Sequence, residues 1–79
     1  MRVQVKLFAT LAARRPGVEA GAPFEVQLPT GATVADLVAH LELPPNEVRL
    51  VFVGGRARPS AWPLHPGDEV GIFPPVGGG

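Results

Sequence analysis

The sequence predicts an α+β domain in which one amphipathic helix packs on one face of a mixed β-sheet. Segments in which apolar and polar residues alternate, as in a half-buried strand, occur near both ends of the chain. Between them, only residues 34–41 place apolar side chains at helical spacing. A chain of 79 residues has room for a single core, and therefore for one domain.

The N-terminal part should supply two strands, over residues 2–8 and 24–28, because apolar residues alternate with polar ones in both segments. Between them, "TLAARR" has room for one helical turn before the Pro- and Gly-rich stretch "PGVEAGAP" interrupts it. The side chains expected to face the core are Val3, Val5, Leu7, Phe24, Val26 and Leu28.

The helix is predicted over residues 34–41. Thr33 is a good N-cap, and Asp36 three residues later resembles a capping box with the shorter acid. The Pro44-Pro45 pair prevents the helix from continuing. Its apolar stripe consists of Val34, Leu37, Val38 and Leu41.

The C-terminal part should supply three further strands, over residues 48–53, 56–58 and 69–73. Gly54-Gly55 predicts a hairpin turn of the primed type, and Gly67 a type II turn before the last strand. The β-grasp is the simplest architecture that has this order of elements. We expect the helix on one face of the sheet, and a polar, solvated surface on the other.

Two aromatic residues are expected on the face that is otherwise predicted to be polar. Phe8 and Phe73 occupy outward positions of the first and last strands. If these two strands are neighbours, the two rings lie close together on the solvated face. A paired aromatic patch there is a candidate for contact with a partner protein.

Composition excludes several classes of function. Seven basic and seven acidic side chains cancel, whereas nucleic-acid binding needs a basic surface. No apolar run approaches the roughly 20 residues that span a bilayer, and the N-terminal segment alternates, unlike a signal peptide. We therefore expect a cytoplasmic protein without nucleic-acid or membrane partners. Cysteine is absent, which removes disulfides and thiolate chemistry.

No set of side chains makes a convincing active site. His40 and His65 are in separate elements, so we expect no metal site. Ser60 is the only serine, and we interpret it as a turn residue. Asp68 and Glu69 are adjacent, so their side chains diverge and do not form an acid–base pair.

Three segments carry a family resemblance. "LPTGATVADL", "LHPGDEVGIFPPV" and the terminal Gly-Gly resemble the MoaD/ThiS sulfur-carrier family of ubiquitin-like proteins. The resemblance runs from "VKLFATLA" to Gly79, and the nearest member type is the small subunit of molybdopterin synthase. The strand followed by two prolines, a valine and glycines is its most specific part.

The resemblance implies a β-grasp domain over residues 1–73 and a flexible tail over residues 74–79. The Gly79 carboxylate would be adenylated by an E1-like enzyme that uses ATP, and then converted to a thiocarboxylate with sulfur from a donor. The sulfur would pass to a pterin precursor held by the larger synthase subunit, and the carrier itself would bind no cofactor. The residues implied to enter the partner are Pro74, Pro75, Val76, Gly77 and Gly78. Phe8 and Phe73, proposed above from their outward positions, would contact the surface of the partner.

Other interpretations stay open. The stretch "VFVGGRARPSAWPL" and the third terminal glycine differ from many molybdopterin-synthase subunits. Sulfur donation of the thiamine type, for tungsten-pterin synthesis, or to tRNA or an amino acid is therefore an alternative. A ubiquitin-like modifier would use the same Gly79 adenylate to form isopeptide bonds. A pure interaction module would not need Gly79.

Overall fold

The computed structural model describes residues 1–75 and has the predicted α+β organisation. It contains one α-helix, two 3₁₀ helices and five strands within these residues. The elements are β1 (Arg2–Leu7), η1 (Ala9–Arg14), β2 (Phe24–Gln27), α1 (Val34–His40), η2 (Pro45–Glu47), β3 (Leu50–Val53), β4 (Arg56–Ala57) and β5 (Glu69–Phe73).

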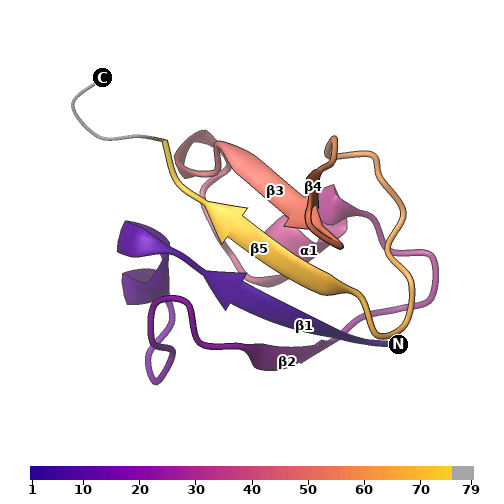
Figure 1. Ribbon diagram of the computed structural model, residues 1–79, viewed down its shortest axis with the longest axis horizontal. Coiled ribbons are helices and arrows are strands. Elements are labelled where there is room, and N and C mark those ends of the chain that lie inside the picture. Colours follow the sequence, from indigo (N-terminus) through magenta and orange to yellow (C-terminus); the bar gives the residue numbers. More distant parts are fainter. Residues whose placement is uncertain (76–79) are drawn as a thin grey trace.

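The five strands form one mixed sheet in the order β2-β1-β5-β3-β4. The two central strands, β1 and β5, run parallel, although they come from opposite ends of the sequence. The other neighbouring pairs are antiparallel. Helix α1 lies across one face of this sheet (Figure 1). This arrangement confirms the predicted β-grasp fold.

The core lies between α1 and the sheet. The central strands contribute Val3, Val5, Leu7 and Ile72, each with none of its surface exposed. From the helix, Leu37 is also fully buried against them. Phe24 is only partly buried at the margin of this core, because β2 is an edge strand. The alternation in the sequence therefore predicted correctly which side of β1 and β5 faces the helix.

Local interactions determine where α1 begins and ends. The Thr33 hydroxyl accepts from the Asp36 N–H (3.2 Å), and the Asp36 carboxylate accepts from the Thr33 N–H (2.8 Å). This is the predicted capping box. The helix ends at His40, before the two prolines, because Glu42 adopts a left-handed conformation (φ +56°) that turns the chain.

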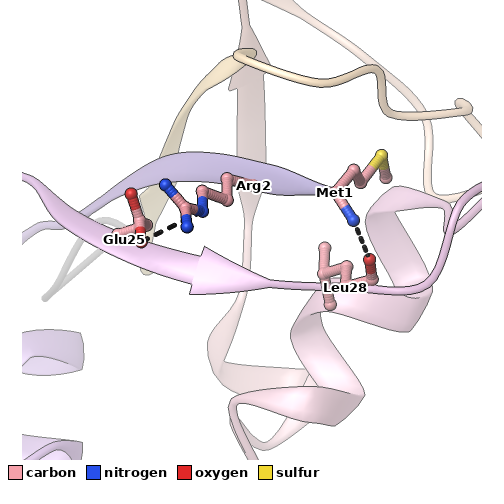
Figure 2. A network of polar contacts seen from close by, with 4 residues as sticks. All are labelled: Met1, Arg2, Glu25 and Leu28. Carbon is pink, nitrogen blue, oxygen red and sulfur yellow. Dashed lines mark hydrogen bonds and ion pairs between the residues drawn. The ribbon is translucent and has the colours of Figure 1, made fainter.

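The first residues of the chain are fixed against β2 (Figure 2). The Met1 ammonium group donates a hydrogen bond to the Leu28 carbonyl (2.6 Å). The neighbouring Arg2 guanidinium lies 3.7 Å from the Glu25 carboxylate, in an exposed ion pair. An exposed pair of this kind adds under about 1 kcal/mol, so register comes mainly from the buried side chains.

Both predicted turns are present. Gly54 and Gly55 have φ values of +61° and +85°, as a type I′ hairpin turn requires. In the turn before β5, Gly67 has φ +83° and the Asp68 N–H donates to the His65 carbonyl (3.1 Å). These turns set the positions of β4 and β5 relative to β3.

Two segments differ from the prediction. The third strand begins at Leu50, two residues later than predicted, because Pro45–Glu47 forms the 3₁₀ helix η2 and Val48 caps it. The single turn expected at "TLAARR" is the longer 3₁₀ helix η1, Ala9–Arg14. An ion pair between Arg14 and Glu47 joins these two 3₁₀ helices. None of the helices within residues 1–75 has the length and apolar character needed to cross a membrane.

Leu37→Ala should lower the free energy of unfolding by about 2–5 kcal/mol, because Leu37 is completely buried between α1 and the sheet. Leu50→Ala is the matched control: Leu50 is 43% exposed, so the same truncation should change stability by under about 0.5 kcal/mol. Urea denaturation measures both. Equal losses in the two variants would contradict the position of the core.

Candidate functional site

The parallel pairing of β1 with β5 brings the two outward aromatic residues together. Leu7 pairs with Ile72, and the Phe8 N–H donates to the Ile72 carbonyl (3.1 Å), so Phe8 lies beside Phe73. Their rings are stacked, with centroids 4.2 Å apart and planes inclined by 3°. The expectation that these rings meet on the open face of the sheet is confirmed.

A third ring completes this group and was not predicted. Phe52 lies in β3, opposite Gly71 of β5, and its ring meets Phe73 edge-on with centroids 5.4 Å apart. We call Phe8, Phe52 and Phe73 the aromatic cluster. The expectation of a generally polar open face is wrong here, because Phe52 joins the two predicted rings and Leu50 is exposed beside them. The sequence does not distinguish the two faces of β3, because all four of its residues are apolar; the structure buries Val51 and Val53 and leaves Leu50 and Phe52 on the other face.

Gly71 provides the space in which the rings pack. A Cβ atom at this position would lie 3.3 Å from Phe8 Cε2 and 3.4 Å from Phe73 Cε1. The first distance is shorter than most carbon–carbon contacts and the second is at the limit of ordinary contact, so a side chain here would press mainly on the Phe8 ring. The absence of a side chain at Gly71 therefore lets the rings lie flat over β5. As a result Phe8 and Phe73 are partly buried by each other, and not freely exposed as the sequence had suggested.

Polar side chains border the aromatic cluster. Gln4, Lys6 and Glu69 are exposed on the same face and line, with the three rings, a shallow hollow of about 480 Å³. Lys6 is the only lysine in the sequence. An apolar centre with a charged margin is the usual composition of a surface that binds another protein.

The C-terminal segment leaves the sheet directly from the aromatic cluster. The Phe73 carbonyl accepts from the Arg49 N–H (2.8 Å), which holds the end of β5 against the start of β3. Pro74 is partly buried and Pro75 is exposed. The remaining predicted site residues, Val76, Gly77, Gly78 and Gly79, lie outside the residues that the structure describes, and their roles stay predictions.

The residues considered for catalysis and metal binding are exposed or take part in the hydrogen bonds of turns. His40 and His65 are exposed, and within residues 1–75 no three His, Asp or Glu side chains gather as metal ligands would. The Asp68 carboxylate accepts from the His65 N–H (2.8 Å), which is turn chemistry. The Ser60 carbonyl accepts from the Ala35 N–H (2.8 Å) at the start of α1.

Comparison with solved structures gives ubiquitin-like proteins of the same fold. A putative molybdopterin converting factor, subunit 1, from Pyrococcus furiosus is 30% identical, with 96% of this chain and 99% of that chain covered and a TM-score of 0.74. Small archaeal modifier protein 1 of Haloferax volcanii is 27% identical, with 95% and 98% covered and a TM-score of 0.74.

A third structure is a complex of subunits 1 and 2 of the molybdopterin-converting factor from Helicobacter pylori. It is 22% identical, with both chains fully covered and a TM-score of 0.62, and shows a likeness of fold. A search of curated proteins gives no match. Residues 5–79, which are nearly the whole chain, match the ThiS family, and the protein therefore belongs to that family.

Proposed function

We propose that this protein is a sulfur carrier whose Gly79 carboxylate is adenylated, converted to a thiocarboxylate and used as the sulfur donor in molybdopterin synthesis. The observation that carries the proposal is the position of Phe73, the residue from which the tail begins, in a chain of the ThiS family. Phe73 is at once the last residue of β5 and the centre of the aromatic cluster. A partner that covers the cluster therefore receives the root of the tail.

The geometry suits delivery of a chain terminus. The root of the tail, Phe73, is held firmly. Its carbonyl accepts a hydrogen bond from the Arg49 N–H, and its ring contacts the rings of Phe8 and Phe52. Pro74 and Pro75 restrict the first steps of the tail and reduce the entropy lost when it enters a partner. Six residues after Phe73 reach roughly 20 Å when extended. Glycine has no Cβ, so the last residues suit a narrow channel.

The chemistry follows from the carboxylate of Gly79. It attacks the α-phosphorus of ATP in an E1-like enzyme, and pyrophosphate leaves, so that the poor electrophile becomes an acyl-adenylate. A sulfide equivalent from a sulfur donor then attacks the carbonyl carbon, forming the C–S bond as the C–O bond to AMP breaks. The sulfur of the resulting thiocarboxylate attacks an activated carbon of the acceptor, forming a C–S bond as the bond from that carbon to its leaving group breaks, so that Gly79 and the acceptor are joined by a thioester. Water then hydrolyses this thioester, which leaves the sulfur on the acceptor and restores the Gly79 carboxylate.

The acceptor we favour is a pterin precursor bound by a larger synthase subunit. Two structural neighbours support it: the Pyrococcus furiosus protein described as a molybdopterin converting factor subunit 1, and the Helicobacter pylori complex of subunits 1 and 2. In such a pair this chain would supply the sulfur, and the larger subunit would supply the binding site for the pterin.

A second candidate function is protein modification. The similarity to small archaeal modifier protein 1 favours it. The Gly79 adenylate would then be attacked by a lysine amine of a target, forming an isopeptide bond with loss of AMP. The two functions share the activation step and differ in the nucleophile that follows it.

With ATP, an E1-like enzyme from the same genome and a sulfur donor, the protein should gain the mass difference of one oxygen replaced by sulfur. Peptide mass spectra should place the change at Gly79, because the sequence contains no cysteine to carry a persulfide. The variant lacking Gly79 should remain folded and should show no ATP–pyrophosphate exchange. Sulfur on another residue, or isopeptide conjugates as the only products, would contradict the carrier function.

Phe73→Ala should weaken binding to the E1-like enzyme by about 2 kcal/mol or more, roughly 30-fold, because the ring is central in the aromatic cluster. Loss of its two ring contacts should also lower stability by about 1–3 kcal/mol. Phe24→Ala is the matched control, since Phe24 packs against the core on the other face. It should lower stability and leave binding unchanged. Calorimetric titration and thermal unfolding measure the two quantities, and equal binding losses in both variants would contradict the assigned surface.

Gly71→Val should separate the stacked rings without removing either of them, because a Cβ there meets Phe8 and Phe73 at 3.3–3.4 Å. We expect altered ring-current shifts of both phenylalanines in NMR spectra, together with weaker partner binding. Gln4→Val, an exposed position on the same face, should leave the ring shifts close to those of the unmodified protein. Unchanged ring shifts in Gly71→Val would show that the close approach is relieved elsewhere.

A further inference from the structure

A second hollow lies at the edge of the fold, between α1, η2 and β3. Its volume is about 660 Å³, within the range of ligand-binding clefts. Its lining is mainly apolar and includes Val34 and Val38 of α1, Leu43, and Val51 of β3. It shares no lining residue with the hollow at the aromatic cluster. We call it the edge groove.

Arg58 lines the edge groove with an unused hydrogen-bond donor. Its guanidinium lies over the Trp62 ring, 4.1 Å from the centroid, and the Arg58 backbone N–H donates to the Val51 carbonyl (2.8 Å). The Nε atom is buried and has no acceptor among residues 1–75. Arg15 Nε is also without an acceptor there, but its contact with the Phe24 ring is longer (5.8 Å) and it lines no part of this groove.

The Nε atom is too buried to contact a ligand, so an anion in the groove would meet the terminal nitrogens of the guanidinium. A carboxylate is the group that matches a guanidinium best, because it accepts two parallel hydrogen bonds from it. Stacking on Trp62 holds the guanidinium in position in advance.

The charges around the groove favour the same ligand. Arg49 is a second arginine in the lining, and neither it nor Arg58 forms an ion pair within residues 1–75. Glu42 is the one acidic residue in the lining, so the groove carries a net positive charge. An anionic group beside an apolar one is therefore complementary to it.

The open edge of β3 favours an extended chain over a compact ligand. Strand β4 pairs with Phe52 and Val53, and the Arg58 backbone N–H donates to the Val51 carbonyl, so only the chain before Val51, including the 43% exposed Leu50, has no partner on its outer side. An added segment can lie along such an edge while alternate side chains enter the groove.

We propose that the edge groove binds an extended peptide segment of a partner protein, in which an acidic residue is flanked by apolar ones. The apolar side chains occupy the floor formed by Val38, Leu43 and Val51, and the carboxylate accepts hydrogen bonds from Arg58, with Arg49 nearby. The groove and the aromatic cluster have no lining residue in common, although Arg49 and Leu50 of the groove lie next to Phe73 of the cluster.

The test is an NMR titration of the full chain with acetylated, amidated pentapeptides of the pattern Ser-x-Asp-x-Ser, where x is Leu, Val or Phe. We expect saturable shifts of the amides that line the edge groove. The matched peptides with Asn in place of Asp should bind at least about 10-fold more weakly, because they lack the charge-assisted hydrogen bonds. Arg58→Gln should weaken binding of the Asp peptides to a similar degree. Arg56→Gln, which removes a charge from the same hairpin outside the groove, should not.

Several results would overturn the proposal: no saturable shift with any Asp peptide, equal affinity for Asp and Asn peptides, or shifts confined to the aromatic cluster. Shifts of the groove amides that depend on protein concentration without peptide would assign the groove to a second copy of the chain instead. If Arg58→Gln loses the dispersed spectrum of the folded protein, Arg49→Gln replaces it, with an expected weakening of at least about 3-fold. None of these results depends on the chemistry of Gly79, so failure here is distinct from failure of the proposed sulfur-carrier function.

Discussion

The parallel pairing of β1 with β5 is the constraint on which the rest of the structure depends. The strands come from opposite ends of the sequence, so the centre of the sheet forms only when the whole chain has closed on itself. Val5 pairs with Val70 and Leu7 with Ile72, and these four side chains are almost completely buried beneath α1. A slip of one residue would expose this set to solvent, so the core specifies the register. That same register places Phe8, which follows Leu7, beside Phe73, which follows Ile72. The C-terminal segment therefore leaves the fold from a fixed aromatic surface.

Much of this fold could be predicted from local patterns. The alternation in β1 and β5, the capping box at Thr33 and the glycines of the hairpin turn each use a rule that acts over a few residues, and each was found as predicted. The start of β3 was harder to predict. Val48 is apolar and extends the strand pattern, but the 3₁₀ helix that begins at Pro45 ends at Glu47, and Val48 caps it. The end of α1 was also set locally, by the left-handed conformation of Glu42, which is uncommon for a residue with a side chain.

The part of the candidate site that depends on the pairing of β1 with β5 could be predicted from the sequence. Phe8 and Phe73 break the polar pattern of their own strands, so each was recognisable alone, and the strand order then brought them together. Phe52 was missed because β3 is nearly all apolar, and alternation between apolar residues does not distinguish the two faces by composition. The edge groove has no local signature at all. It is formed by residues from α1, η2 and β3, and its unpaired donor becomes evident only when Arg58 is seen over Trp62.

On the proposed function, one terminus must visit an activating enzyme, a sulfur donor and an acceptor in succession. Every visit uses the tail, and the aromatic cluster lies at its root, so partners that bind through both compete for the same surface. Such competition allows only one partner to bind at a time, but it gives little means of distinguishing the partners. The edge groove has a lining of its own, and it meets the root of the tail only where Arg49 and Leu50 lie next to Phe73. Selection among partners therefore requires contacts away from the tail, and the positively charged apolar groove beside β3 is the described surface whose chemistry differs most from that of the aromatic cluster.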